Sequence, residues 1–376
     1  MMTPEVAPMR YRPTVAVVNL AAVRHNVRTL TPSGTGFMAV VKANGYGHGS
    51  VPVARAALEA GASWLGVALV EEGVALRDAG IDAPILVLTE FPRGSEKEAL
   101  AAGLTPVLYT EDGIEGLAEA ARSLKRSPEA HVKVDTGMHR VGLPPERAAA
   151  FLERLADRGV RAAGILTHFA KSEAPDDPAT RQQLSTFGRL LQELAGRGMK
   201  PPLCHAANTA ASMVIPESRL DLVRIGIGTY GIAPDPSLAG IADLRPVMSL
   251  RSRVTLAKRV GRGHALSYGF TYRLGRDANI ATVPVGYADG YARSLSNRAQ
   301  VLIRGQRYPV VGTVTMDQLL VECGDDHVEP GDEVVLFGRQ GQDEIRAEDV
   351  AAWWGTLGYE VVCAVSERVP REYVDG

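Results

Sequence analysis

The sequence predicts an α/β protein: a closed, parallel (β/α)8 barrel of the TIM type, followed by a mostly β C-terminal domain. Three observations support this fold class. Eight short apolar runs alternate with helix-like stretches between residues 37 and 228. The pattern changes near residue 245 to strands and turns. A length of 376 residues corresponds to two or three domains.

The eight apolar runs are continuous rather than alternating, as expected of strands buried on both faces. They are FMAVVKAN (37–44), WLGVALV (64–70), PILVLTE (84–90), TPVLYT (105–110), AHVKVDTG (130–137), RAAGILTH (161–168), PLCHAAN (202–208) and LVRIGIG (222–228). Stretches with helical periodicity separate them, and two of these stretches end in Gly61 and Gly80, a common helix stop signal. Eight β–α units in succession predict a closed barrel.

The second part of the chain reads mainly as strands, among them ANIATVPVGY, AQVLIRG, YPVVGTVTM, QLLVEC and DEVVLFG. One helix, AEDVAAWWGTL, precedes a last expected strand, YEVVCAVS. The segment 233–246 is rich in Pro and Asp and is a plausible linker. We therefore expect a barrel domain over 1–240 and a mostly β domain over 241–376.

Composition excludes several classes of function. Lys and Arg number 41 against 43 Asp and Glu, so no overall basic field attracts nucleic acid or an anionic membrane. No apolar run approaches the ~20 residues that span a bilayer, and the first twenty residues lack a signal core. The three cysteines have neither zinc-site nor disulfide-framework spacing. We expect a cytoplasmic protein without a metal site.

Polar and basic residues gather where the predicted barrel strands end, the face on which such barrels perform chemistry. They are Lys42, Lys133, Asp135, Arg140, His168, His205, Asn208, Thr209 and Arg224. The last two loops are the usual phosphate site of such barrels, and the backbone of IGIGTYG suits an anion. A lysine at the first strand end suggests a Schiff base with an aldehyde cofactor such as pyridoxal 5′-phosphate.

Eight motifs make the chain resemble the alanine racemase family. They are VVKANGYGHG (40–49), VDTGMHRVG (134–142), THFA (167–170), HAANTA (205–210), RIGIGTYG (224–231), LSYGFTY (266–272), VGYADGY (285–291) and TMDQ (315–318). The resemblance covers nearly the whole chain, with the motifs in family order. It implies a pyridoxal-phosphate-dependent racemase that interconverts L- and D-alanine, supplies D-alanine for peptidoglycan and works as a homodimer.

The resemblance also implies catalytic roles. Two bases are needed to remove the Cα proton on one face and to return one on the other: Lys42, which also binds the cofactor, acts on the D face, and Tyr268 acts on the L face. His168 and Arg224 stand behind the tyrosine and favour its phenolate. Arg224 meets the pyridine nitrogen. Since arginine only donates, that ring stays uncharged and transamination is disfavoured.

The resemblance assigns binding roles to further residues. The cofactor binders are Lys42, Tyr46, Asn208, Thr209, Arg224, Gly226, Ile227 and Tyr373, with Glu367 as the alternative position for the last tyrosine. The substrate binders are Arg140, Met316, Asp317 and Tyr287. Lys133 is expected to be carbamylated and to brace Arg140. Tyr268, Met316 and Asp317 are expected to reach the site from the second subunit.

Several alternatives compete with this interpretation. A broad-specificity amino-acid racemase would use the same scaffold, because entry-channel side chains decide substrate size. A decarboxylase of this architecture needs a protonated ring, which Arg224 disfavours. A non-catalytic pyridoxal-phosphate-binding protein would lack the β domain that carries Tyr268. Gly226, Gly228 and Gly231 also match G-x-G-x-x-G, but the following Ile-Ala-Pro-Asp-Pro cannot open the helix that dinucleotide binding requires.

Overall fold

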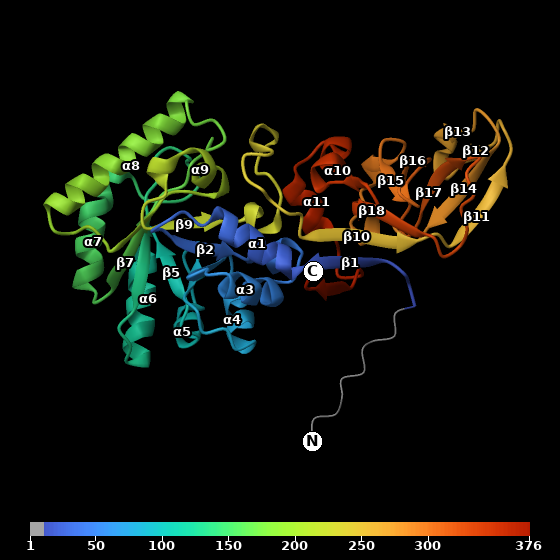
Figure 1. Ribbon diagram of the computed structural model, residues 1–376. Helices are drawn as coiled ribbons and strands as arrows, with labels where there is room; N and C mark the ends of the chain where they lie inside the picture. Colours follow the sequence, from blue (N-terminus) through green and yellow to red (C-terminus); the bar gives the residue numbers. More distant parts are fainter. Residues whose placement is uncertain (1–10) are drawn as a thin grey trace, which may run out of the picture. The chain divides into compact units, whose positions relative to one another are not determined.

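The structure is a computed structural model that describes residues 11–376. It contains two compact units, residues 20–245 and residues 11–19 with 246–375 (Figure 1). The first twenty residues were predicted to lack a signal core. Residues 1–10 of that segment lie outside the described residues. The expected boundary after residue 240 falls five residues before the end of the first unit.

The first unit is built on eight parallel strands. They are β2 (Gly36–Val40), β3 (Trp64–Val67), β4 (Ile85–Val87), β5 (Thr105–Leu108), β6 (Glu129–Lys133), β7 (Arg161–Leu166), β8 (Leu203–His205) and β9 (Leu222–Ile225). Their order in the sheet is β8-β7-β6-β5-β4-β3-β2-β9. Backbone hydrogen bonds from Asp221 to Cys204 and from Arg224 to Ala207, both 3.0 Å, join the two end strands. The predicted parallel barrel is therefore confirmed, with all eight apolar runs forming its strands.

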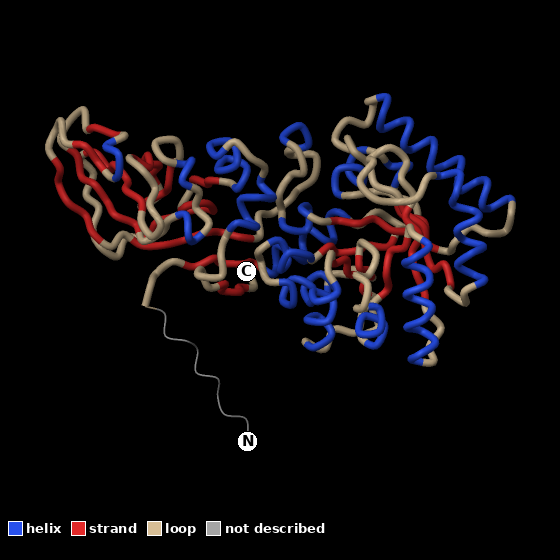
Figure 2. Tube along the Cα trace, turned by 180° about the vertical axis from the view of Figure 1, so that it is seen from behind, coloured by secondary structure: helices blue, strands red, loops and turns tan. Residues whose placement is uncertain are grey.

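Helices surround these strands on the outside (Figures 1 and 2). They are α1 (Leu20–Leu30), α2 (Lys42–Tyr46), α3 (Ser50–Glu59), α4 (Val70–Asp78), α5 (Glu96–Ala101), α6 (Glu111–Leu124), α7 (Ala148–Asp157), α8 (Pro178–Gly196) and α9 (Thr209–Val214), with short 3-10 turns η1 (Pro145–Arg147), η2 (Pro216–Ser218), η3 (Ile227–Tyr230) and η4 (Pro236–Leu238). Gly61 and Gly80 follow α3 and α4 with φ of 106° and 77°, the left-handed conformation that ends helices.

Apolar side chains from several strands pack in the barrel. Met38, Leu86, Val107, Leu166 and Leu222 form one fully buried cluster. Partly buried Trp64, Leu88 and Tyr109 pack against it. Filling the barrel with side chains leaves its strand ends as the place where polar groups can meet a ligand.

The second unit is mostly β, as predicted. Its large sheet has the order β11-β14-β17-β16-β15-β18-β10-β1-β20, with β19 paired to β18. The strands are β1 (Val15–Asn19), β10 (Met248–Arg253), β11 (Leu256–Val260), β14 (Ala278–Val283), β15 (Gln300–Ile303), β16 (Gln306–Val311), β17 (Leu319–Gly324), β18 (Glu333–Gln340), β19 (Asp343–Ile345) and β20 (Arg371–Val374), beside a small pair, β12 (Ala265–Leu266) and β13 (Tyr272–Arg273). Helix α10 (Ala347–Trp354) and the 3-10 turns η5 (Tyr268–Phe270), η6 (Tyr287–Asp289) and η7 (Arg293–Leu295) complete the unit.

Two expectations about this unit were wrong. The first strand, β1, was assigned to the barrel domain, but it pairs with β10 and β20 in the large sheet. The segment YEVVCAVS was expected as a strand, but Gly358–Ala364 forms helix α11. Its buried residues Gly358, Val361 and Val362 follow the helical spacing of three and four, which outweighs the strand preference of the two valines.

Within residues 11–376 no helix combines the length and the apolar character needed to cross a bilayer. Over the same range, no three or more His, Cys, Asp or Glu side chains come together as a metal site.

Candidate active site

The barrel strands carry the predicted polar residues to the ends where their chains leave the sheet. Lys42 follows β2 by two residues, Lys133 ends β6, and His168 follows β7 by two residues. His205 ends β8 and Arg224 lies inside β9. Parallel strands end on one side of a barrel. The side chains of five different strands are therefore directed to one region.

Arg224 is the centre of this region. It is 4% exposed, and its two terminal nitrogens donate to three backbone carbonyls, Thr167 O at 2.7 Å, Ala206 O at 2.9 Å and His205 O at 3.0 Å. Burial lowers the pKa of Arg224 to about 10, so the guanidinium stays protonated at neutral pH. These bonds fix the guanidinium plane, and no residue of 11–376 accepts from its Nε–H.

The same guanidinium fixes the protonation of two histidines. Nη2 lies 3.1 Å from His168 Nδ1, and Nη1 lies 3.0 Å from His205 Nδ1. Arginine has no acceptor atom, so both Nδ1 atoms must accept, and the ring proton of each histidine sits on Nε2. Burial, followed by the charge of Arg224, lowers the pKa of both rings well below the ordinary value. Both are therefore neutral at physiological pH.

A third histidine extends this line into the barrel. His205 Nε2 lies 2.8 Å from His131 Nδ1, and since His205 carries its proton on Nε2, His131 accepts. Burial lowers the pKa of His131 to about 3. Its own Nε2 is fully buried and has no hydrogen-bond partner among residues 11–376. The His131 ring instead packs against the Trp64 ring at 5.3 Å.

Four cationic side chains converge on this region. The charges of Arg224, Lys133, Arg140 and Lys42 all help to lower the pKa of His168. Lys133 is 6% exposed, and burial together with its three cationic neighbours lowers the pKa of its amine to about 8. Asp135 opposes that shift only in part. The region therefore suits a ligand that carries more than one negative charge.

The side chains of Arg140, which is exposed, and of Lys133, which is buried, make no hydrogen bond or ion pair with any residue that the structure describes. The chain between them is held by Asp135, whose Oδ1 accepts the N–H groups of Gly137, Met138 and His139 at 2.9–3.1 Å. This turn presents Arg140 beyond the end of β6. Its guanidinium can bind a carboxylate or a phenolic oxygen.

The chain after Lys42 takes an uncommon conformation. Residues 43–47 all have positive φ, and three of them, Ala43, Asn44 and Tyr46, are not glycine. A left-handed turn costs an ordinary residue about 1–2 kcal/mol, so it requires support from its surroundings. Tyr46 is buried and packs on Tyr230 at a ring distance of 4.8 Å, and the Tyr230 hydroxyl donates to Val40 O at 3.0 Å.

The turn brings Tyr46 to the loops after β8 and β9. A Cβ atom on Gly226 would lie only 2.5 Å from the Tyr46 Oη, so any larger residue at position 226 would displace the Tyr46 hydroxyl. Thr209 Oγ1 accepts the Gly226 N–H at 3.2 Å, and Ile227 begins η3 beside it. Asn208 caps α9 by accepting the Ala211 N–H at 2.9 Å. The structure thus brings together the predicted phosphate-binding residues of the barrel.

The remaining predicted residues lie in the second unit. Tyr268 and Met316 are exposed to 75% and 52%, and Tyr287 to 42%. Thr313 Oγ1 donates to Tyr268 O at 2.8 Å, and Ala288 N–H donates to Met316 O at 3.1 Å. Three loops with large exposed side chains are therefore tied together within this unit.

Asp317 and Tyr373 have partners of their own. Asp317 Oδ1 accepts from Arg368 Nη2 at 2.7 Å, which raises the pKa of that guanidinium. Tyr373 lies on β20 opposite Val18 of β1, and burial raises the pKa of its phenol. Its role in a phosphate site stays a prediction.

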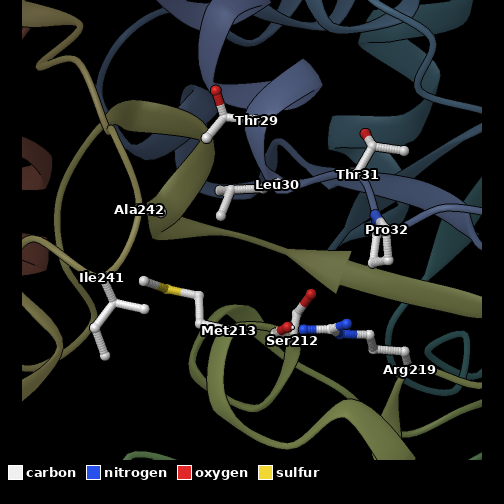
Figure 3. Close-up of a pocket in the computed structure, with 9 residues that line it drawn as sticks. All are labelled: Thr29, Leu30, Thr31, Pro32, Ser212, Met213, Arg219, Ile241 and Ala242. Carbon is white, nitrogen blue, oxygen red and sulfur yellow. Dashed lines mark hydrogen bonds between the residues drawn. The ribbon is translucent and has the colours of Figure 1, made fainter.

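The barrel unit contains a pocket of about 260 Å³. Leu30, Met213, Arg219 and Ile241 are among the residues that line it (Figure 3). Arg219 is held there by donating from Nε to Ser212 O at 2.9 Å. None of the predicted site residues lines this cavity.

Three residues of the region had no role in the sequence interpretation: His205, His131 and Tyr230. His205 is the last residue of β8, and His168 lies two residues after the preceding strand, β7. The position of His205 at a strand end was therefore a sequence feature that could have suggested a role. His131 lies two residues before Lys133, and this spacing of two puts both side chains on one strand face. Nothing in the sequence linked Tyr230 to Tyr46, because 184 positions separate them.

Comparison with known families gives matches over both units. The model of the alanine racemase N-terminal domain matches residues 18–234, and that of the alanine racemase C-terminal domain matches residues 247–373. An alanine racemase of Symbiobacterium thermophilum is 51% identical over 366 residues, which are 96% of this chain and 97% of that protein.

Solved structures agree with these matches. The alanine racemase of D-cycloserine-producing Streptomyces lavendulae has 39% identity and a TM-score of 0.93 over 98% of both chains. The alanine racemase of Bartonella henselae, crystallised with covalently bound pyridoxal phosphate, has 28% identity and a TM-score of 0.86 over 96% of this chain and 99% of that one. With both domain models matched and a relative above half identity along almost its whole length, this chain belongs to the alanine racemase family.

Proposed function

We propose that this chain binds pyridoxal phosphate on Lys42 and interconverts L- and D-alanine with two bases, Lys42 and Tyr268. The observation that carries the proposal is the arrangement of Arg224. It is buried, donates through both terminal nitrogens to fixed partners, and keeps its Nε–H for a ligand. A donor-only group at the pyridine nitrogen separates a racemase from enzymes that need that nitrogen protonated.

The residues present fit this cofactor. The convergence of Lys42, Lys133, Arg140 and Arg224 matches its phosphate and phenolic charges. Tyr46, Thr209 and the glycine at 226 form a cradle in which backbone lies close to a hydroxyl. We assign the phosphate to Tyr46, Asn208, Thr209, Gly226 and Ile227, with Tyr373 as a further donor.

When bound, pyridoxal phosphate withdraws electrons from the substrate and makes its Cα proton acidic. The chain then has to move that proton between two faces. Lys42 Nζ takes or returns it on the D face, and the Tyr268 oxygen does so on the L face. Each base should increase the reaction rate by a factor of about 10²–10⁴.

Tyr268 needs help to act as a base, because a phenol has an ordinary pKa near 10. The His168 Nε2–H is the donor that Arg224 leaves available on that ring. Donation to the phenolate and the positive charge behind it favour the ionised form. His168 itself stays neutral because its pKa is depressed, so it donates without becoming an acid.

Arg140 binds the substrate carboxylate and the cofactor's phenolic oxygen through its fork of donors. Lys133 is the group we expect to brace it after carbamylation. Lowering the pKa of this amine to about 8 makes a larger share of it neutral at physiological pH than in an ordinary lysine, and the neutral form is the one that attacks carbon dioxide. The product is an anion beside three cationic side chains, Arg224, Arg140 and Lys42.

We further propose a homodimer in which Tyr268, Met316 and Asp317 complete the partner's site. The exposure of Tyr268 and Met316, whose loops are joined by hydrogen bonds, supports this, because it leaves both side chains accessible to a partner. The Met316 amide would hold the substrate carboxylate. Tyr287 would narrow the entry and favour a side chain as small as that of alanine. The D-alanine formed would supply peptidoglycan synthesis.

The test is a purified preparation assayed for D-alanine from L-alanine, with its absorption recorded at the band of a lysine-bound cofactor. Lys42→Ala should lose the absorption band, and its racemase activity should fall at least about 10³-fold. Lys97→Ala is the matched control, since Lys97 is exposed on α5. A Lys42→Ala variant that keeps both the band and racemisation would overturn the proposal. Serine and lysine as substrates test its breadth.

A further inference from the structure

The carboxylate of Glu72 binds two loops at the mouth of the barrel. Its Oε1 accepts the Ala43 N–H at 2.6 Å, and its Oε2 accepts the Ala68 and Leu69 N–H groups at 2.8 and 3.1 Å. Ala68 and Leu69 lead into α4, whose third residue is Glu72 itself. Ala43 comes directly after Lys42. One side chain therefore connects the start of α4 to the residue that follows the cofactor lysine.

Lys42 is consequently held from both sides by the same β–α unit. The Val41 N–H, just before it, donates to Gly66 O of β3 at 2.8 Å. The Ala43 N–H, just after it, donates to Glu72 of α4. The Lys42 amine stands at the end of a flexible stem of four carbons. The position of the Lys42 Cα therefore decides which atoms the amine can reach.

The backbone after Lys42 depends on such a bond. Ala43 begins the left-handed turn with φ of 51° and ψ of 52°, a conformation that its Cβ disfavours. Bonds inside the turn, from Gly47 N–H to Ala43 O at 3.0 Å and from Gly45 N–H to Val41 O at 2.9 Å, leave the Ala43 N–H unused. Because Ala43 is exposed, water competes for that N–H, and a charged acceptor competes best.

We infer that Glu72 is a positioning residue for Lys42: its carboxylate holds the strained turn after β2 and thereby sets the reach of the lysine amine. The inference rests on the proposed role of Lys42. An amide cannot replace this carboxylate. Glutamine has one accepting oxygen, so it can serve the Ala43 N–H or the pair in the other loop, but not both sides.

The test uses Glu72→Gln, which keeps the size of the side chain. Glu71→Gln is the matched control, because it removes the same charge one residue away and the exposed Glu71 side chain makes no hydrogen bond with residues 11–376. Hydrogen exchange of the peptide 41–50, followed by mass spectrometry in the holoenzyme, should be at least about ten-fold faster in Glu72→Gln and unchanged in the control. This readout does not depend on racemisation. It therefore separates failure of the positioning role from failure of the proposed function.

Kinetics give the second readout. We expect kcat of Glu72→Gln to fall at least about ten-fold, with KM for alanine changed less than about two-fold, because Glu72 positions the lysine that moves the proton and does not bind the substrate. Adding Ala43→Gly should restore part of kcat, since glycine adopts positive φ without a steric cost. Equal exchange and kcat in the two single variants would overturn the inference, as would faster exchange throughout the chain or a failed rescue. Glu72→Asp replaces Glu72→Gln if the latter does not fold.

Discussion

Arg224 donates from Nη2 to His168 Nδ1 at 3.1 Å, and this contact sets the chemistry of the site. The histidine must accept there, so its only proton points away from Arg224 on Nε2. A permanent cation thus acts through a neutral ring, which remains neutral because burial and neighbouring charges depress its pKa. Under the proposed function, this arrangement would stabilise an anionic oxygen beyond the ring without supplying a group that would protonate it.

Replacing Arg224 by Glu should change the outcome of the reaction. A carboxylate would hold a proton on the pyridine nitrogen, which strengthens electron withdrawal and prolongs the life of the carbanion. We expect a new absorption band at long wavelength with alanine present, slower racemisation and measurable transamination to pyruvate. Stopped-flow spectra and pyruvate assay check this.

Arg224→Lys is the control, because lysine keeps the charge and only donates. That variant should lose activity without the new band. A long-wavelength band of equal strength in both variants would argue against the role assigned to the guanidinium.

The three linked histidines should make the fold sensitive to acid. Their folded pKa values lie below the ordinary 6.5, so below pH 6.5 the unfolded chain binds protons that the native protein does not. Stability is therefore lost as the pH falls. Between pH 7.5 and 5.5 each histidine should cost about 1.4 kcal/mol of the free energy of unfolding.

His131→Asn tests this linkage, because asparagine offers an oxygen near the position of Nδ1 and cannot titrate. This variant should keep the hydrogen bond to His205. It should remove about a third of the decrease in the free energy of unfolding between pH 7.5 and 5.5, as measured by urea unfolding at both pH values. His131→Leu should cost about 1–3 kcal/mol at pH 7.5, since it leaves the His205 Nε2–H buried without an acceptor. A pH dependence unaltered by His131→Asn would mean that the ring titrates in the folded state.

Lys133 should react with carbon dioxide more readily than an ordinary lysine. Lowering the pKa from 10.5 to about 8 increases the neutral fraction at pH 7 by about 300-fold. Carbamate occupancy in ¹³C-labelled bicarbonate should rise as the pH is raised from 6.5 to 8.5, with Lys133→Ala as the blank. The measurement is a ¹³C resonance of the carbamate. Its absence over the whole range at high bicarbonate would contradict the assignment.

Shared sites predict complementation between inactive chains. In the proposed dimer, one chain supplies Lys42 to a site and its partner supplies Tyr268. A mixed dimer of Lys42→Ala and Tyr268→Phe chains would therefore contain one intact site and one site that carries both substitutions. Random reassortment of equal amounts makes half of the dimers mixed, and about a quarter of the wild-type activity should return. Co-expression with two affinity tags measures this. If each site came from one chain, mixing would restore none.

Much of the barrel could be predicted from the sequence, because strands buried on both faces have to be continuously apolar. The run FMAVV became β2 and LVRI became β9 for that reason. The strand β1 was assigned to the wrong unit because its partners, β10 and β20, lie more than 220 residues away along the chain. Local pattern identifies a strand but does not choose its neighbour.

The sequence identified most residues of the site but not the hydrogen bonds that connect them. His168 and Arg224 were recognised from motifs, whereas the line from Arg224 through His205 to His131 depends on side chains that meet only across the closed barrel. The left-handed turn at 43–47 was also missed, since Ala43 and Tyr46 give no local reason for positive φ. Its support comes from Glu72, 29 residues away.

The most direct test of the two-base account is hydrogen exchange at Cα catalysed by Tyr268→Phe in deuterium oxide. With Lys42 intact, this variant should exchange the Cα hydrogen of D-alanine for deuterium and return D-alanine, while L-alanine exchanges at least about 10² more slowly. Proton NMR of the recovered amino acids gives both rates. Equal exchange of the two enantiomers, or continued racemisation, would contradict the assignment of the two faces to Lys42 and Tyr268.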